Sequence, residues 1–249
     1  MALQSDYWQR VCESLFVKSP GWFTAVQSLP DKLDLQVCLS RTVSGEAVTG
    51  SAIQAQGWVG RGIVKEIKPN PLRPEDNPFT QLQWAYLQFM YSFFLFEGLY
   101  NYLVDSGQGA PEMWHPTFIK QFIELSQTMT FYSAMLIAAE EHRLPESEAN
   151  LEPIIREEVR KIVYVLTAKT TDYGQAFLRH GVVGLLYRVW DKIARYATLS
   201  AENRAAKYES RKDTAMDMLG YSVLIWSILE DMQANLPDVG IMLETGVQG

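Results

Sequence analysis

Apolar residues at helical spacing, which recur from residue 79 to about residue 233, constrain the fold of this chain more than any other feature. The first such segment, Phe79 to Phe96, contains no charged residue and is rich in aromatic side chains. Further helices are expected at Pro116 to about Arg143, about 152 to 172, about 176 to 199 and about 202 to 233. The spacing predicts a mainly α fold.

The segment Phe79 to Phe96 approaches the length of about 20 residues that a membrane-spanning helix needs. Three glutamines interrupt it, Glu97 follows at once, and no Lys or Arg flanks it to set an orientation. We therefore expect a buried core helix rather than a membrane span. Docking of this segment on a membrane or on a partner helix is a weaker alternative.

The residues before this segment predict a small α+β portion, residues 1–67, and a proline-rich linker, residues 68–78. An amphipathic helix is expected over Ser5 to Val17, a half-buried strand over Leu33 to Leu39, where apolar and polar residues alternate, and a second strand over Ile63 to Ile67. The later helices divide into a helical hairpin, residues 79–145, and a carboxy-terminal helical domain, residues 150–235.

Composition excludes several classes of function. The chain of 249 residues has a net charge of −7 and 47% hydrophobic residues, as in a folded globular protein, and an acidic surface repels nucleic acid. Only Cys12 and Cys38 are cysteines, and the amino terminus does not resemble a secretory signal. These features favour a cytoplasmic protein that does not bind nucleic acid or span a membrane.

Three acidic residues recur every four positions near the carboxy end: Glu209, Asp213 and Asp217. On a helix these residues span only about 80° of the circumference and share one face. Like charges at this spacing destabilise a bare helix by about 0.2–0.5 kcal/mol per pair, so cations must compensate them. Mg²⁺ prefers hard oxygen ligands and is one such cation.

The preceding helix carries Arg188, Lys192 and Arg195 on one face. Residues 169–217 contain nine Lys or Arg and six Asp or Glu, a net charge of +3, against −10 for the rest of the chain. Two interpretations remain open. The acids and bases pair with one another as surface salt bridges, or the acids hold a metal ion while the bases bind phosphate.

The same residues form a recognisable series: Lys169-x-x-Asp172-Tyr173-Gly174, then Asp191-Lys192-x-x-Arg195, then Glu209-Ser210-x-x-Asp213-x-x-x-Asp217-x-x-x-Tyr221. This series resembles the nucleotide-modification-associated domain, a relative of the MazG-like all-α nucleoside triphosphate pyrophosphohydrolases. The resemblance covers about residues 152–234, roughly a third of the chain.

The resemblance implies a four-helix core, often completed by dimerisation, that holds Mg²⁺ and hydrolyses a nucleoside triphosphate to the monophosphate and pyrophosphate. Carried over by position, Glu209 and Asp213 match metal ligands, and Asp217 helps one turn further along. The implied substrate-binding residues are Lys169, Asp172, Tyr173, Lys192, Arg195 and Tyr221, and Arg188 joins them as a candidate because it shares the helix face of Lys192. We therefore expect a Mg²⁺-dependent homodimer that binds a nucleotide or another phosphorylated small molecule.

The first helix departs from the family pattern. The enzymes have Glu-Glu-x-x-Glu, whereas this chain has Glu157, Glu158 and then Lys161 in place of the third acid. Glu157 and Glu158 remain the candidates for the general base that activates water. Loss of one carboxylate also favours binding without hydrolysis, and the rival hypothesis is a non-catalytic interaction or scaffold protein with a degenerate MazG-like fold.

Overall fold

The structure, a computed structural model, describes residues 22–41, 80–145, 150–173, 176–202 and 210–235. Its elements are α2 (Trp22–Lys32), α3 (Leu35–Ser40), α5 (Gln81–Asp105), the 3₁₀ helix η3 (Pro111–Met113), α6 (Pro116–Glu140), α7 (Leu151–Tyr173), α8 (Ala176–Glu202) and α9 (Arg211–Ala234). No strand occurs within these ranges. The prediction of a mainly α fold is confirmed.

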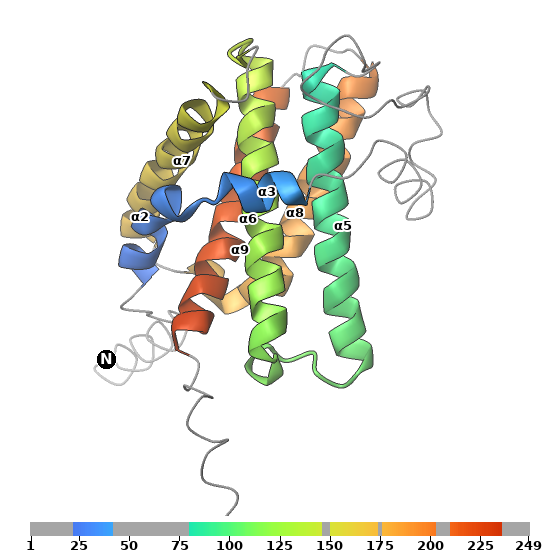
Figure 1. Cartoon of the computed structure of the whole chain (residues 1–249), viewed down its shortest axis with the longest axis vertical. Coiled ribbons are helices and arrows are strands. Elements are labelled where there is room, and N and C mark those ends of the chain that lie inside the picture. The colour runs from blue at the N-terminus through green and yellow to red at the C-terminus, as the bar shows by residue number, and fades with distance from the viewer. Residues whose placement is uncertain (1–21, 42–79, 146–149, 174–175, 203–209, 236–249) are drawn as a thin grey trace, which may run out of the picture.

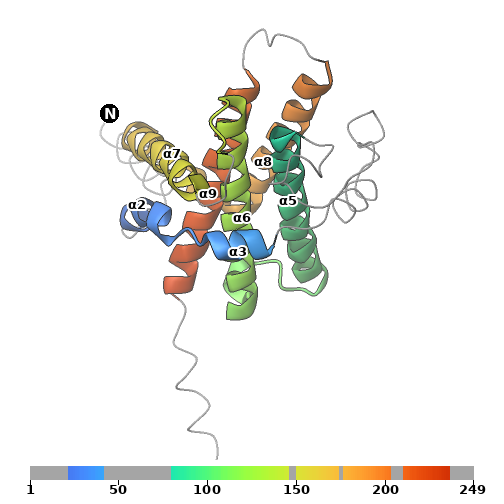
Figure 2. The ribbon, with the colours of Figure 1, turned by 45° about the horizontal axis from the view of Figure 1, so that its top comes forward.

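Helices α6 and α9 pack against each other through the middle of the molecule (Figures 1 and 2). Helices α5 and α8 lie on one side of this pair, and α2 and α7 lie on the other, while α3 crosses α6. Every residue of α6 from Leu125 to Ala138 is buried. One continuous hydrophobic core therefore joins the helical hairpin α5–α6 to the carboxy-terminal helices.

The helix starts follow from local hydrogen bonding. Thr80 caps α5 in a capping box with Gln83, and Pro116 occupies the first turn of α6, where its missing N–H costs nothing. Helix α5 buries Trp84 to Met90 without interruption, so the expected core helix is confirmed. Among the described helices, none combines the length and apolar character that crossing a membrane requires.

The strand expected over Leu33 to Leu39 is wrong, because Leu33 and Asp34 link α2 to the short helix α3, which begins at Leu35. The Asp34 carboxylate accepts hydrogen bonds from the backbone N–H groups of Gln36 and Val37, at 2.9 and 3.2 Å, and so starts the helix. Cys38 is buried, and α3 packs on α6. The other predictions for residues 1–79, a helix at 5–17, a strand at 63–67 and the linker at 68–78, lie outside the described residues.

Helix α9 begins later than expected, and α8 contains a kink. Helix α9 begins at Arg211 rather than near residue 202, because Ser210 has an extended backbone and caps it. Helix α8 is kinked at Gly181, where φ is +57° and ψ is −164°. An L-residue is strained at such a φ value, so glycine is needed at this kink.

Arg156 of α7 attaches α2 to the bundle. Its guanidinium donates to the carbonyl oxygens of Pro30 and Leu33, the latter at 2.9 Å, and pairs with Glu152 at 2.7 Å. These two carbonyls lie at the end of α2, where helical hydrogen bonds run out. Arg156 of α7 thus supplies hydrogen-bond donors to carbonyl groups at the carboxy end of α2.

The carboxy end of α6 stores backbone strain at His142, which has a φ of +55°. Its N–H donates to Ala139 O at 3.1 Å, and the Arg143 N–H donates to Ala138 O at 2.8 Å, which is a Schellman motif. We expect His142→Gly to raise the free energy of unfolding by about 0.5–1 kcal/mol, because glycine has no Cβ to strain. Urea unfolding measures the gain. His142→Ala is the control, and an equal gain in both variants would show that backbone strain is not the cause.

Candidate functional site

Helices α8 and α9 bring one acid of the predicted acidic ridge (Glu209, Asp213 and Asp217) against the predicted basic face (Arg188, Lys192 and Arg195). The Lys192 ammonium lies 2.6 Å from Asp217 Oδ2, and the side chains are 20% and 40% exposed. Arg188 is exposed and Arg195 half-buried, one turn before and after Lys192, while Tyr221 is half-buried one turn after Asp217. The basic face and the acidic ridge were expected to lie close together, and they meet at Lys192 and Asp217.

Asp213 has a local structural task. Its Oδ2 accepts hydrogen bonds from the Ser210 hydroxyl at 2.7 Å and from the Ser210 N–H at 3.0 Å, while the Asp213 N–H donates to Ser210 Oγ at 3.1 Å. These bonds form a capping box at the start of α9. The hydrogen bonds from the Ser210 side chain, and then from its backbone, hold the pKa of Asp213 below its usual value. The side chain is exposed, so it remains accessible to solvent ions.

The donor set for Mg²⁺ depends on Glu209, which lies outside the described residues. Asp213 and Asp217 offer hard oxygen atoms of the type that Mg²⁺ prefers. Within the described ranges, no three His, Cys, Asp or Glu side chains are grouped closely enough to hold a metal ion. Two carboxylates of the expected three are thus placed on α9, and they fit Mg²⁺ only together with further ligands such as Glu209 or water.

The expected residues at the end of α7 are placed in part. Lys169 is exposed, five residues after the exposed Tyr164. Asp172 and Tyr173 belong to the last turn of α7, and their side chains lie outside the described part of the chain. Helix α7 packs on α2, α6 and α9.

The candidate general bases on α7 are both engaged with cations. Glu158 is 7% exposed and forms ion pairs with Arg143 and Lys161, the second at 2.8 Å. Glu157 is exposed and pairs with Lys161 at 2.5 Å, and this hydrogen bond lowers the pKa of Glu157. Lys161 therefore contacts and partly neutralises both of these acids.

The acids of α7 and of α9 face different neighbours. Glu158 lines a pocket together with Lys212 and Met216 of α9, whereas Asp217 pairs with α8. Lys212 and Asp213 are consecutive, so their side chains project about 100° apart around the helix. The described geometry does not bring Glu158 to the carboxylates of Asp213 and Asp217.

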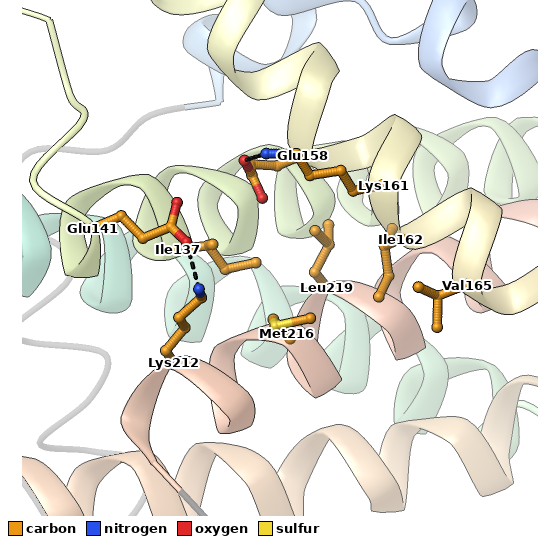
Figure 3. Close-up of a pocket in the computed structure, with 9 residues that line it drawn as sticks. All are labelled: Ile137, Glu141, Glu158, Lys161, Ile162, Val165, Lys212, Met216 and Leu219. Atoms are coloured by element: carbon orange, nitrogen blue, oxygen red, sulfur yellow. Dashed lines mark hydrogen bonds and ion pairs between the residues drawn. The ribbon is translucent and has the colours of Figure 1, made fainter.

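The pocket itself was missed by sequence reasoning. It has a volume of about 230 Å³ and lies between the end of α6, the middle of α7 and the first half of α9 (Figure 3). Its lining residues are Ile137, Glu141, Glu158, Lys161, Ile162, Val165, Lys212, Met216 and Leu219. No spacing in the sequence joins three separate helices, so only the fold reveals this pocket.

A partly buried polar network fixes α8 against α6 and α9. The Tyr196 hydroxyl donates to Glu140 Oε1 at 2.6 Å, and the Arg211 Nε lies 3.0 Å from the same oxygen. Burial, followed by this hydrogen bond to Glu140, raises the pKa of the Tyr196 phenol above its ordinary value. The network positions the helix that carries Lys192.

Comparison of the chain with family models, with curated proteins and with solved structures finds no match.

Proposed function

We propose that this protein binds a nucleotide, or another phosphorylated small molecule, together with Mg²⁺ on the face shared by α8 and α9. The observation that carries the proposal is the ion pair between Lys192 and Asp217, which joins a carboxylate of the acidic ridge to a helix face with two further arginines. Acids for a metal ion and bases for phosphate oxygens are the two parts that a metal–phosphate ligand requires.

Binding proceeds in this proposal by an exchange of partners. Asp217, with Asp213 and Glu209, turns to the metal ion, and the Lys192 ammonium turns to a phosphate oxygen. Arg188 and Arg195 lie within one turn of Lys192 on the same helix face, so their guanidinium groups extend the phosphate-binding surface. Bound Mg²⁺ would neutralise phosphate charge at this face.

We propose binding of the ligand as the function. If the protein is also an enzyme, it hydrolyses a bound nucleoside triphosphate to the monophosphate and pyrophosphate. Hydrolysis needs a general base near the attacking water. Glu157 and Glu158 are held by Arg143 and Lys161, and Glu158 faces the pocket rather than α8. The resemblance of residues 152–234 to MazG-like proteins supports the proposal, and with it a MazG-like arrangement of α7–α9 and a homodimer.

A non-catalytic interaction or scaffold protein is the second candidate. The ion pair of Asp217 and the capping role of Asp213 favour it, because both carboxylates already stabilise the fold. In this case the ridge contributes only the modest energy of partly exposed salt bridges and a helix cap.

A melting-temperature screen of the full chain with Mg²⁺ and each nucleoside triphosphate separates the two candidates. A ligand at 100 times its dissociation constant adds about 2.7 kcal/mol to the stability of the native state, a shift of about 5–10 °C for a chain of this size. We expect such a shift with at least one nucleotide, and only when Mg²⁺ is present.

Asp217→Asn and Lys192→Gln test the site directly. Each variant is expected to lower affinity at least tenfold, which reduces the added stability at the same ligand concentration to at most about 1.4 kcal/mol. Asp191→Asn, an exposed acid beside Lys192, is the matched control and should keep the full shift. A screen without any shift supports the scaffold, and equal shifts in all variants place the ligand elsewhere. Where binding is found, a pyrophosphate-release assay with Asp213→Asn, which removes the charge and keeps an acceptor for the cap, identifies hydrolysis.

A further inference from the structure

The pocket between α6, α7 and α9 has a charged end and an apolar end (Figure 3). At the charged end, Lys212 lies 2.5 Å from Glu141, and Lys161 lies 2.8 Å from Glu158. The side chains of Ile162 and Val165 lie at the other end, away from both ion pairs. A ligand that fills this pocket must therefore be amphipathic.

The side chains that line the charged end carry both signs of charge in equal number, and Arg143, which pairs with both of its glutamates, is offset by Glu157 at 4.0 Å. A ligand with only a carboxylate would face Glu141 and Glu158, and a ligand with only an ammonium would face Lys161 and Lys212. A zwitterion meets a complementary charge for each of its own. The protein groups retain capacity for it, because an ammonium has three donors and a carboxylate accepts about four hydrogen bonds.

The volume limits the size of the ligand. With about 30 Å³ for each water molecule of the liquid, a pocket of about 230 Å³ corresponds to about eight waters. Pockets for drug-sized ligands begin at about 300 Å³, so this pocket is too small to enclose a whole nucleotide. A molecule of the size of leucine or methionine matches the pocket.

We propose that this pocket binds a free α-amino acid with an apolar side chain. Its ammonium lies beside the carboxylates of Glu141 and Glu158, and its carboxylate lies beside Lys161 and Lys212. Its side chain packs against the apolar residues Ile162, Val165, Met216 and Leu219. The pocket is on the α7 side of α9, whereas the Lys192–Asp217 pair is on the α8 side, so this inference does not rest on the proposed function.

Isothermal titration calorimetry of the full chain with L-leucine and L-methionine tests the proposal. Three analogues each remove one feature: isocaproate lacks the ammonium, isoamylamine lacks the carboxylate, and glycine lacks the apolar side chain. We expect leucine or methionine to bind, and each analogue to bind at least about tenfold more weakly, the size of effect that a lost hydrogen bond to a charged group produces. Binding of isocaproate or isoamylamine as tight as that of leucine overturns recognition of a zwitterion, and absence of binding by both amino acids overturns the site.

Two pairs of variants locate the bound amino acid. Val165→Phe fills the apolar end, and Ala168→Phe adds the same ring at an exposed position of the same helix. Lys212→Met removes one ammonium of the pocket, and Lys120→Met removes an exposed one from α6. We expect the pocket variants to lower affinity at least about tenfold while both controls bind as the parent chain does. If leucine affinity is unchanged in Val165→Phe and in Lys212→Met, it binds elsewhere and the proposal is overturned.

Discussion

Phe122→Ala is expected to lower the free energy of unfolding by about 3–5 kcal/mol, because it leaves a cavity where three parts of the chain meet. The Phe122 side chain of α6 is fully buried. Its ring centroid lies 4.5 Å from that of Phe96 in α5 and 4.6 Å from that of Trp114, which follows η3. Loss of the ring removes both aromatic contacts together with the buried apolar area.

Denaturation by urea, followed by circular dichroism, measures this loss. Tyr164→Ala is the control, since Tyr164 is also on a helix but is 77% exposed, and surface substitutions stay within about 0.5 kcal/mol. Similar losses in the two variants would contradict the packing of Phe122 between Phe96 and Trp114. A change in the slope of the transition would instead point to an altered unfolded state.

Stability is expected to fall steeply above about pH 10, because the native state raises the pKa of two tyrosines above the value that they have in the unfolded chain. The rings of Tyr86 and Tyr196 stack with their centroids 5.0 Å apart, and the Tyr86 hydroxyl donates to Ile193 O at 3.0 Å. Burial raises the pKa of the Tyr86 phenol, and burial with the bond to Glu140 raises that of Tyr196, above the ordinary value of 10.0. The unfolded chain releases these protons near pH 10 while the native chain keeps them.

Each such tyrosine contributes about 1.4 kcal/mol of lost stability per pH unit in this range, so the pair contributes about 2.7. Urea denaturation at several values between neutral pH and strongly alkaline pH measures the slope. In Tyr86→Phe the slope is expected to fall by about half of the pair's contribution. Tyr164 is 77% exposed, so Tyr164→Phe is the control and should leave the slope unchanged. An unchanged slope in Tyr86→Phe would contradict a neutral, buried phenol at this position.

The sequence allows the long helices to be predicted, because their apolar residues keep helical spacing over many turns. Helix α6 is the clearest case, with Pro116 at its start and buried residues along its length. Alternation over a few residues is weaker evidence, and at Leu33 to Leu39 it gave a strand where the Asp34 cap and packing on α6 produce a helix. Helix α2 is not among the expected helices, and it contains Pro30, a residue type that usually ends or kinks a helix.

The candidate site shows which interactions spacing can predict. Spacing placed Lys192 and Asp217 on helix faces that meet. The pattern Ser210-x-x-Asp213 is also typical of a helix cap, and in the structure it forms one. The sequence alone is therefore compatible with two roles for Asp213, a metal ligand and a helix-capping residue. The contact of Glu158 with Arg143 depends on where the end of α6 lies beside α7, and no local pattern encodes that.

The central position of α6 affects how this chain is made in a cell. Its main neighbour, α9, is the last of the described helices to be synthesised, so α6 leaves the ribosome well before the surface that covers it. Until then its apolar side chains, and those of α5, are open to contact with other nascent chains. Helices α5 and α6 therefore need protection by a chaperone, or fast collapse on each other, during the time that translation takes to reach residue 234.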